Sequence, residues 1–244
     1  MKPHALRGIG LMVLAVSTFA CLDAISKLLT AHYAIATIVW ARYLFQAALM
    51  LAVLAPRLGM GWLRTANPRL QVVRGLVLTA ASLVFLTALS RMPLAEAASI
   101  AFMAPLIVAV LAGPLLRERV DARTWAALAA GFGGVLLIIR PGGDLFTWAA
   151  LLPLASAALM AAYQLLTARL AGRDGTFTTL FYPALVGTLV VPLVYPALFA
   201  LPREPLHAAM FVALGALGGI GHFFLIRAHD YASASTLSPF IYTQ

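Results

Sequence analysis

Residues 94–116 read LAEAASIAFMAPLIVAVLAGPLL, an apolar run in which Glu96 is the single ionisable side chain. A helix that crosses a bilayer needs about 20 mostly apolar residues, and this run meets that length. Similar runs recur along the whole chain, separated by short breaks that contain Pro, Gly and Asn. The sequence therefore predicts an all-α, polytopic membrane helical bundle.

The composition excludes a soluble globular protein. Of the 244 residues, 63% are hydrophobic and 10% are charged, whereas soluble domains have roughly 45–50% apolar and roughly 25% charged residues. The formal net charge of +9 comes from Lys and Arg that are dispersed in ones and twos between the apolar runs. This dispersion is typical of topology signals in membrane proteins rather than of nucleic-acid binding. We therefore expect a lipid bilayer around the chain and no nucleic acid partner.

Eight spans and one fragment are expected. The spans cover residues 8–29, 34–55, 70–89, 94–116, 125–139, 145–166, 177–201 and 207–226, and the apolar stretch 233–244 is expected to start a ninth. The connections are too short to hold a soluble domain, so any activity must reside within the bundle or at its two mouths. Pro105 and Pro239 lie within spans, where proline kinks or breaks a helix, and they are the expected hinges.

The distribution of Lys and Arg predicts the orientation, because cytoplasmic segments of membrane proteins are enriched in both. With a cytoplasmic N-terminus, the inner segments collect Lys2, Arg7, Arg57, Arg64, Arg69, Arg74, Arg117, Arg119, Arg123, Arg169, Arg173 and Arg227. The outer segments collect Lys27, Arg91, Arg140 and Arg203, and Arg42 lies inside a span. We therefore expect a multi-pass protein of the cell inner membrane with a cytoplasmic N-terminus.

An internal repeat is predicted at a shift of about 140 residues. FLTALSRMPL at 85–94 aligns with LIRAHDYASA at 225–234, and Gly75 aligns with Gly215. The repeat divides the chain into residues 1–140, a five-helix unit, and residues 141–244, a second unit of about three and a half helices. Because five is odd, consecutive units cross the membrane in opposite senses and form an inverted repeat. We expect the second unit to be truncated, since a half-span leaves backbone groups unsatisfied in lipid.

Three stretches resemble the EamA-type members of the drug/metabolite transporter superfamily. They are FLTALSRMPLAEAASIAFMAPLIVAVLAGPLLRERV at 85–120, WAALAAGFGGVLLIIRPGG at 125–143 and RAHDYASASTLSPFIYTQ at 227–244. Arg117-Glu118-Arg119 is similar to the Gly-Glu-Arg turn of that family, with Leu116 in place of the glycine. The resemblance implies ten helices in two halves and a carrier of small metabolites such as amino acids, nucleosides, vitamins, S-adenosylmethionine or metal-chelating compounds.

Ionisable residues within spans are the first candidates for a site, because each costs roughly 2.5–3.5 kcal/mol at the bilayer centre. Asp23 lies about 9 Å from the outer end of its span and Arg42 about 12 Å from the end of the next, at 1.5 Å per residue. We expect these two side chains to face each other in a cavity, with Glu96 near the same level. The alternative is a structural ion pair between Asp23 and Arg42, with Lys27 and Glu96 extending to the interface.

Three further polar residues are expected to contribute to substrate binding or coupling. His222 lies in the eighth span among small residues and aligns with Ser82 in the repeat. A histidine can take part in a proton-coupled step, although a structural hydrogen bond explains it as well. Gln164 and Tyr163 are polar residues on an otherwise apolar helix that can orient a ligand, while packing alone explains the tyrosine equally well.

The preferred function is a secondary-active transporter that moves a small metabolite, such as an amino acid, a vitamin or a related compound, by alternating access. The alternatives are a non-transporting membrane scaffold or inactive truncated remnant, and an integral membrane enzyme. We expect no enzyme activity, cofactor or metal site, because the five His form no HExxH-like pair and Cys21 is the single cysteine. The expected partners are a small-molecule substrate and the lipid bilayer. The sequence is also compatible with a homodimer.

Overall fold

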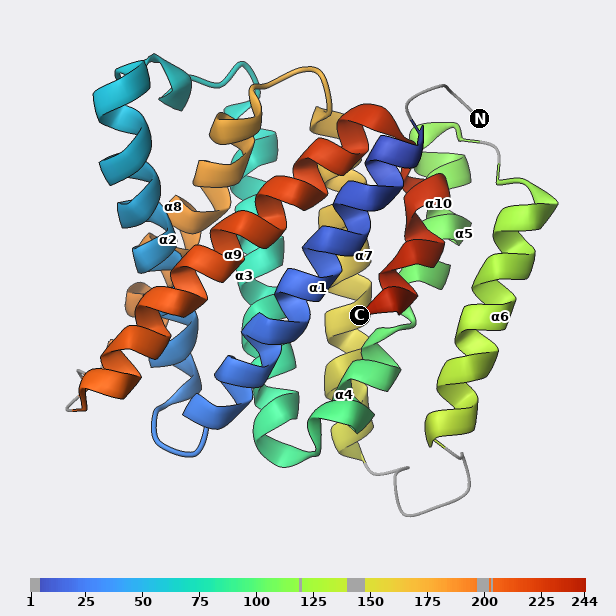
Figure 1. The fold of residues 1–244 in the computed structure, drawn as a ribbon, viewed down its shortest axis with the longest axis horizontal. Helices are drawn as coiled ribbons and strands as arrows, with labels where there is room; N and C mark the ends of the chain where they lie inside the picture. The colour runs from blue at the N-terminus through green and yellow to red at the C-terminus, as the bar shows by residue number, and fades with distance from the viewer. Residues whose placement is uncertain (1–4, 119, 140–147, 197–201, 203) are drawn as a thin grey trace.

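The chain forms an all-α bundle (Figure 1), and the computed structural model describes residues 5–118, 120–139, 148–196, 202 and 204–244. The described α-helices are α1 (Ala5–Leu29), α2 (Ile35–Leu58), α3 (Pro68–Arg91), α4 (Leu94–Ala101), α5 (Ala104–Leu116), α6 (Ala122–Ile139), α7 (Leu151–Leu170), α8 (Thr176–Val194), α9 (Pro205–Tyr231) and α10 (Ala234–Leu237). Short 3₁₀ helices cover η1 (Gly61–Leu63), η2 (Trp148–Ala150) and η3 (Ser238–Thr243). No strand occurs within the described ranges.

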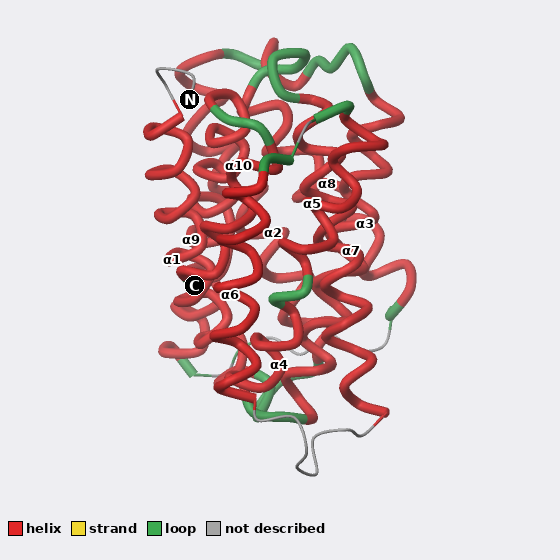
Figure 2. The backbone as a smooth tube through the Cα atoms, turned by 90° about the vertical axis from the view of Figure 1, so that its right-hand side faces the viewer, coloured by secondary structure: helices red, strands yellow, loops and turns green. Residues whose placement is uncertain are grey.

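Seven segments of the described residues are long and apolar enough to cross a membrane, which makes the protein a polytopic membrane bundle. Figure 2 shows the helices running between two ends, where the loops gather. We call the end that holds the start of α1 and the α2–α3, α7–α8 and α9–α10 connections the N-face. The opposite face holds the α1–α2 and α3–α4 connections (Figure 1).

Proline fixes several helix boundaries. Pro68 and Pro205 lie in the first turns of α3 and α9, where the missing N–H costs no hydrogen bond. Both helices are longer than the predicted spans, and α8 ends at Val194, earlier than expected. At the other end of α3, Met92 is extended because the residue before Pro93 is disfavoured in the helical region.

The run 94–116 is one of the seven membrane-crossing segments, but it consists of two helices rather than one continuous helix. The α4 helix ends at Ala101, and α5 begins at Ala104 with Pro105 in its first turn. A proline ring clashes with the carbonyl four residues earlier, which is that of Ala101, and proline has no N–H to donate. The chain breaks in the same way near Pro239, where α10 gives way to η3. Both prolines expected as hinges therefore lie next to helix breaks.

The packing pairs helices of the two predicted units. The α1 helix lies along α9, α3 lies along α7, and α2 packs against α8. The backbones at the α3–α4 and α9–α10 turns are also alike, with φ and ψ of −144° and 163° at Met92 and −142° and 156° at Ala232. These residues are related by the 140-residue shift, so the turn aligned in the sequence has one geometry in both places.

Small residues let the paired helices approach closely, as expected where lipid supplies no hydrophobic drive for helix association. A Cβ added to Gly187 of α8 would collide with the ring of Tyr43 on α2. A Cβ added to Gly215 of α9 would lie 2.5 Å from the Cβ of Phe45. Larger residues at these two glycines would push α2 away from its neighbours.

The α5–α6 connection begins with a left-handed residue. Arg117 has φ of +56°, so the position in this turn that suits a glycine is 117, not Leu116 as expected. The next residue, Glu118, accepts hydrogen bonds from the backbone N–H groups of Ala234 and Ser235 at 3.2 and 3.0 Å. This carboxylate links the end of α5 to the start of α10 at the N-face.

Some expectations lie outside the described residues. They concern Lys2, Arg119, Arg140 and Arg203 in the orientation argument, and the break at residues 141–144.

Candidate functional site

A cavity of about 140 Å³ lies between α1, α2, α3, α4, α7 and α9, with the start of α5 and the end of η3 also in its wall. Four of the six predicted site residues, Asp23, Arg42, Gln164 and His222, line it. Its remaining wall is mostly apolar, with three phenylalanine rings and several aliphatic side chains. Apolar walls with a few convergent polar groups are typical of small-molecule sites. The structure therefore brings together, from four different helices, most of the residues that the sequence singled out.

Arg42 is held by α3, not by an acid. Its guanidinium donates to the hydroxyl of Ser82 at 2.7 Å and lies over the ring of Tyr43, 4.6 Å from the centroid. The Ser82 hydroxyl is also within 2.9 Å of the Tyr43 hydroxyl and donates to the Leu78 carbonyl. The Nε of Arg42 is buried and has no hydrogen-bond partner among the described residues. The charge of Arg42 is thus oriented by neutral groups and keeps donor capacity for a ligand.

Asp23 does not form the structural ion pair that was the alternative expectation. No ion pair between Asp23 and Arg42 occurs among the described residues. The carboxylate of Asp23 instead accepts a hydrogen bond of 2.9 Å from the side-chain amide of Gln244. The physical reason is that the guanidinium of Arg42 is turned toward Ser82. The cavity therefore holds one acidic and one basic side chain that form no direct ion pair with each other.

Two neutral polar side chains face the cavity without a protein partner. Gln164 is 4% exposed and Ser26 is 3% exposed, and both line the cavity. Within the described part of the chain, neither the Gln164 amide nor the Ser26 hydroxyl has a hydrogen-bond partner. Buried polar groups normally have partners. These two are suited to bind a polar solute or water.

His222 and Tyr163 form one unit at the N-face side of the cavity. The Nδ1 of His222 lies 3.2 Å from the Tyr163 hydroxyl, and the ring of Phe19 packs against the imidazole at a centroid distance of 4.8 Å. Tyr163 itself does not line the cavity and is fully buried. Tyr163, a predicted site residue, therefore contacts His222 through its hydroxyl and does not face the cavity itself.

Arg74, expected among the inner segments, is a further site candidate. It is 0% exposed in α3, and its guanidinium lies 5.1 Å from the Tyr163 ring centroid. It donates to the Thr167 hydroxyl at 3.0 Å and to the Thr179 carbonyl. The signal was present in the sequence, because Arg74 falls within the predicted span 70–89 and ionisable residues in spans are functional candidates.

Glu96 and Lys27 are not among the residues that line the cavity. Glu96 lies in the first turn of α4, where free N–H groups favour a carboxylate. Lys27 donates to the carbonyls of Leu89 and Met92, the second at 3.1 Å. Lys27 therefore caps the C-terminal end of α3 instead of extending to the interface.

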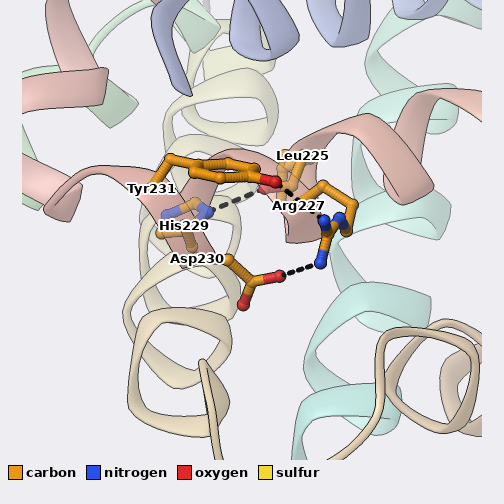
Figure 3. Close-up of polar contacts among 5 residues, drawn as sticks. All are labelled: Leu225, Arg227, His229, Asp230 and Tyr231. Carbon is orange, nitrogen blue, oxygen red and sulfur yellow. Dashed lines mark hydrogen bonds and ion pairs between the residues drawn. The ribbon is translucent and has the colours of Figure 1, made fainter. Parts of the chain in front are cut away.

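The end of α9 carries a separate polar cluster (Figure 3). Arg227 donates to the Asp230 carboxylate at 3.0 Å and to the Tyr231 hydroxyl at 2.9 Å. His229 Nδ1 lies 2.9 Å from the Leu225 carbonyl. All these partners are three or four residues apart on one helix. These contacts therefore stabilise the end of α9, and none of their polar side chains lines the cavity.

Asp174 closes the N-face between the α2–α3 and α7–α8 connections. Its carboxylate accepts hydrogen bonds from the Thr65 hydroxyl at 2.5 Å, the Gln71 amide at 2.9 Å and the Ala66 N–H at 3.2 Å. Partial burial raises the pKa of Asp174, but these hydrogen bonds outweigh that effect and hold the pKa below its usual value. Asp174 is thus ionised at neutral pH and joins two loops from different halves of the chain.

The family model of the EamA-like transporter family matches residues 6–140. The chain is 31% identical to the riboflavin transporter of Rhizobium johnstonii, over 94% of this chain and 76% of that protein. It is 29% identical to the pseudopaline exporter CntI of Pseudomonas aeruginosa, over 95% of this chain and 81% of that protein. It is 25% identical to the S-adenosylmethionine uptake transporter of Rickettsia conorii, over 98% of this chain and 81% of that protein.

A solved crystal structure has the same fold. It superposes with a TM-score of 0.79 at 21% sequence identity and covers 99% of this chain and 84% of that one. At this identity the match establishes the architecture of the bundle alone.

Proposed function

The chain belongs to the EamA-like transporter family, so it is a membrane-embedded transporter of a small molecule, and we propose that it is a secondary-active carrier of zwitterionic metabolites. The class we propose carries an ammonium group, a carboxylate and an apolar body, as an α-amino acid does. One observation supports this choice above all: Asp23 and Arg42 line one cavity without forming an ion pair.

The charges in the cavity fit the two ends of such a solute. An ammonium group on Asp23 and a carboxylate on Arg42 would each form a charge-assisted hydrogen bond, the strong kind. Phe19, Phe85 and Phe102 line the same cavity and offer rings against which an apolar body can pack. S-adenosylmethionine, named in one relative, is itself an α-amino acid derivative. Gln164 would bind a further polar group of the solute.

The helix pairing supports an alternating-access mechanism. The α1–α9 and α3–α7 contacts are related by the 140-residue shift, as they would be in two units of opposite orientation, residues 1–140 and 141–244. The cavity lies where these pairs meet. Rocking of one unit against the other would expose the cavity to each face in turn, driven by the gradient of the solute or of protons.

We place the protein in the cell inner membrane with the N-face in the cytoplasm. The exposed arginines Arg57, Arg64 and Arg69 lie at this end of α2 and α3. An excess of Lys and Arg is typical of cytoplasmic segments.

Transport in proteoliposomes tests the proposed solute class. The probes are L-phenylalanine, its deaminated analogue 3-phenylpropionate and its decarboxylated analogue phenethylamine. We expect Asp23→Asn to reduce phenylalanine uptake by about ten- to hundredfold, the range for a lost charged hydrogen bond, and to leave 3-phenylpropionate unchanged. Arg42→Gln should reduce uptake of phenylalanine and 3-phenylpropionate and leave phenethylamine unchanged.

Arg91→Gln is the control, because Arg91 is an exposed arginine at the end of α3, outside the cavity. It should transport all three probes as the unsubstituted chain does. Equal loss of all three probes in Asp23→Asn would contradict the ammonium contact. Absence of flux for every probe would contradict a zwitterion carrier and favour the non-transporting scaffold.

A further inference from the structure

Arg74 is a charged side chain in the apolar interior that the transport cavity does not reach. It lies six residues after the start of α3 at Pro68, about 9 Å from the N-face end at 1.5 Å per residue. It is 0% exposed, and no carboxylate within the described ranges lies at ion-pair distance. A buried charge normally has a charged partner. Arg74 lacks one in this conformation.

The guanidinium of Arg74 keeps unused donors. One terminal nitrogen donates to the Thr167 hydroxyl at 3.0 Å and the other to the Thr179 carbonyl, while Nε is buried and unpartnered among the described residues. A guanidinium has five N–H donors in a fork that fits a carboxylate. The neutral groups around Arg74 therefore orient the guanidinium but leave some of its N–H donors without hydrogen-bond partners.

Tyr163 separates Arg74 from the cavity. One face of the Tyr163 ring covers the guanidinium, and its hydroxyl is bonded to His222, which lines the cavity. A shift of α7 against α9 that breaks the Tyr163–His222 hydrogen bond would remove this partition. The polar groups would then run without interruption from Gln164 and His222 to Arg74.

Between Arg74 and the N-face, hydrogen bonds hold the surrounding elements together. Gln71 lies one turn before Arg74 on α3, and its amide donates to Asp174 at 2.9 Å and to Thr179 at 3.3 Å. Thr178 of α8 also donates to the Trp62 carbonyl at 2.6 Å. These contacts join the α2–α3 connection to the start of α8. Separation of the two would open Arg74 to the N-face.

We propose that Arg74 is a second binding residue for the anionic group of the solute, used when the carrier is open to the N-face. The carboxylate held by Arg42 in the cavity passes to Arg74 once Tyr163 moves. The anionic group of the solute would thus bind to Arg42 and Arg74 in succession. The Tyr163 ring between them keeps only one of the two arginines accessible to the solute at a time. The inference rests on the proposed carrier function.

Cysteine accessibility tests this proposal without requiring transport. In a Cys21→Ser background, Thr167→Cys puts a thiol next to Arg74 and leaves the arginine in place. The reagent is membrane-impermeant 2-sulfonatoethyl methanethiosulfonate, added to vesicles whose outer surface carries the N-face. We expect labelling about tenfold or more faster than that of Ala184→Cys, an equally buried position in α8 away from the cavity. Labelling no faster than at position 184 would overturn the proposal.

Protection by a carboxylate tests the role of Arg74 itself. We expect 3-phenylpropionate to slow the labelling of Thr167→Cys, and the added change Arg74→Gln to weaken this protection about ten- to hundredfold. Arg74→Lys should keep part of the protection, and Arg69→Gln, an exposed arginine on the same helix, should keep all of it. Protection that persists in Arg74→Gln would overturn the anion site. The carrier proposal fails separately, through absent flux.

Discussion

The hydroxyl of Tyr163 lies 3.2 Å from Nδ1 of His222, and this contact joins α7 to α9 at the N-face side of the cavity. Both side chains are buried, the tyrosine fully. The contact matters because it fixes a cavity residue through a partner that the solute does not reach. The tyrosine ring also covers Arg74, so a single side chain contacts both the cavity histidine and the buried arginine.

Tyr163→Phe should therefore lower stability and weaken solute binding without removing any residue that lines the cavity. The substitution leaves His222 without its partner, and a net loss of about 0.5–1.5 kcal/mol in unfolding free energy is expected for one hydrogen bond. We also expect a weaker apparent affinity for solute, because the imidazole loses its fixed orientation. Thermal unfolding in detergent and initial uptake rates measure the two effects. Unchanged affinity would show that the orientation of His222 does not matter for binding.

Exchanging the charges of Asp23 and Arg42 should not restore transport. Arg42 is positioned by Ser82 and Tyr43 rather than by Asp23, so the double variant Asp23→Arg with Arg42→Asp loses those contacts. We expect uptake at or below that of either single neutral variant. Full recovery in the double variant would indicate a structural ion pair in another conformation. Uptake of labelled phenylalanine provides the comparison.

Lys27→Met should destabilise the end of α3. The ammonium of Lys27 is the donor to the Leu89 and Met92 carbonyls, and methionine keeps the chain length but donates nothing. Hydrogen bonds to charged groups contribute about 1.5–3 kcal/mol, so a clear fall in the unfolding temperature is expected. Arg91→Met, at the same end of α3, removes only a contact of the exposed guanidinium with the Trp148 ring, 5.2 Å from its centroid, and should lower it less. Equal stability of both variants would contradict the capping role.

Arg117→Gly should stabilise the protein. Arg117 has φ of +56°, a conformation that costs a residue with a side chain roughly 1–2 kcal/mol and glycine little. The extra freedom of glycine in the unfolded chain offsets part of that gain. We expect a small rise in unfolding temperature, with transport unchanged. A fall would mean that the side chain of Arg117 makes a stabilising contact with lipid.

Acid should weaken the closure at the N-face through Asp174. Its pKa is held below the usual 3.8, so its contribution to folding is fully present above that pH. The contribution is lost as the pH falls through the lowered value, because the protonated carboxyl accepts the loop hydrogen bonds less well. Stability that depends on Asp174 should thus stay constant from neutral pH down to about pH 5. Asp174→Asn should remove this part of the acid dependence of unfolding.

Much of the fold could be predicted from the sequence. Apolar runs of membrane-crossing length, interrupted by Pro and Gly, indicated the helices, their order and the bilayer as solvent. The repeat placed the α3–α4 and α9–α10 turns at equivalent positions, and their backbones agree. Asp23, Arg42, Gln164 and His222 were found as cavity residues because polar groups in lipid are costly and rarely lack a role.

The tertiary structure alone decided which side chains meet. Helices such as α1 are apolar on every side, so periodicity could not say which face turns inward or which helix it contacts. The Arg42–Ser82 contact, the burial of Arg74 beneath Tyr163 and the cap that Lys27 provides all join residues far apart in the chain. Local sequence determined where helices begin and end, because backbone chemistry is local. Pairing depended on shape and on small residues at helix crossings, which only the assembled bundle contains.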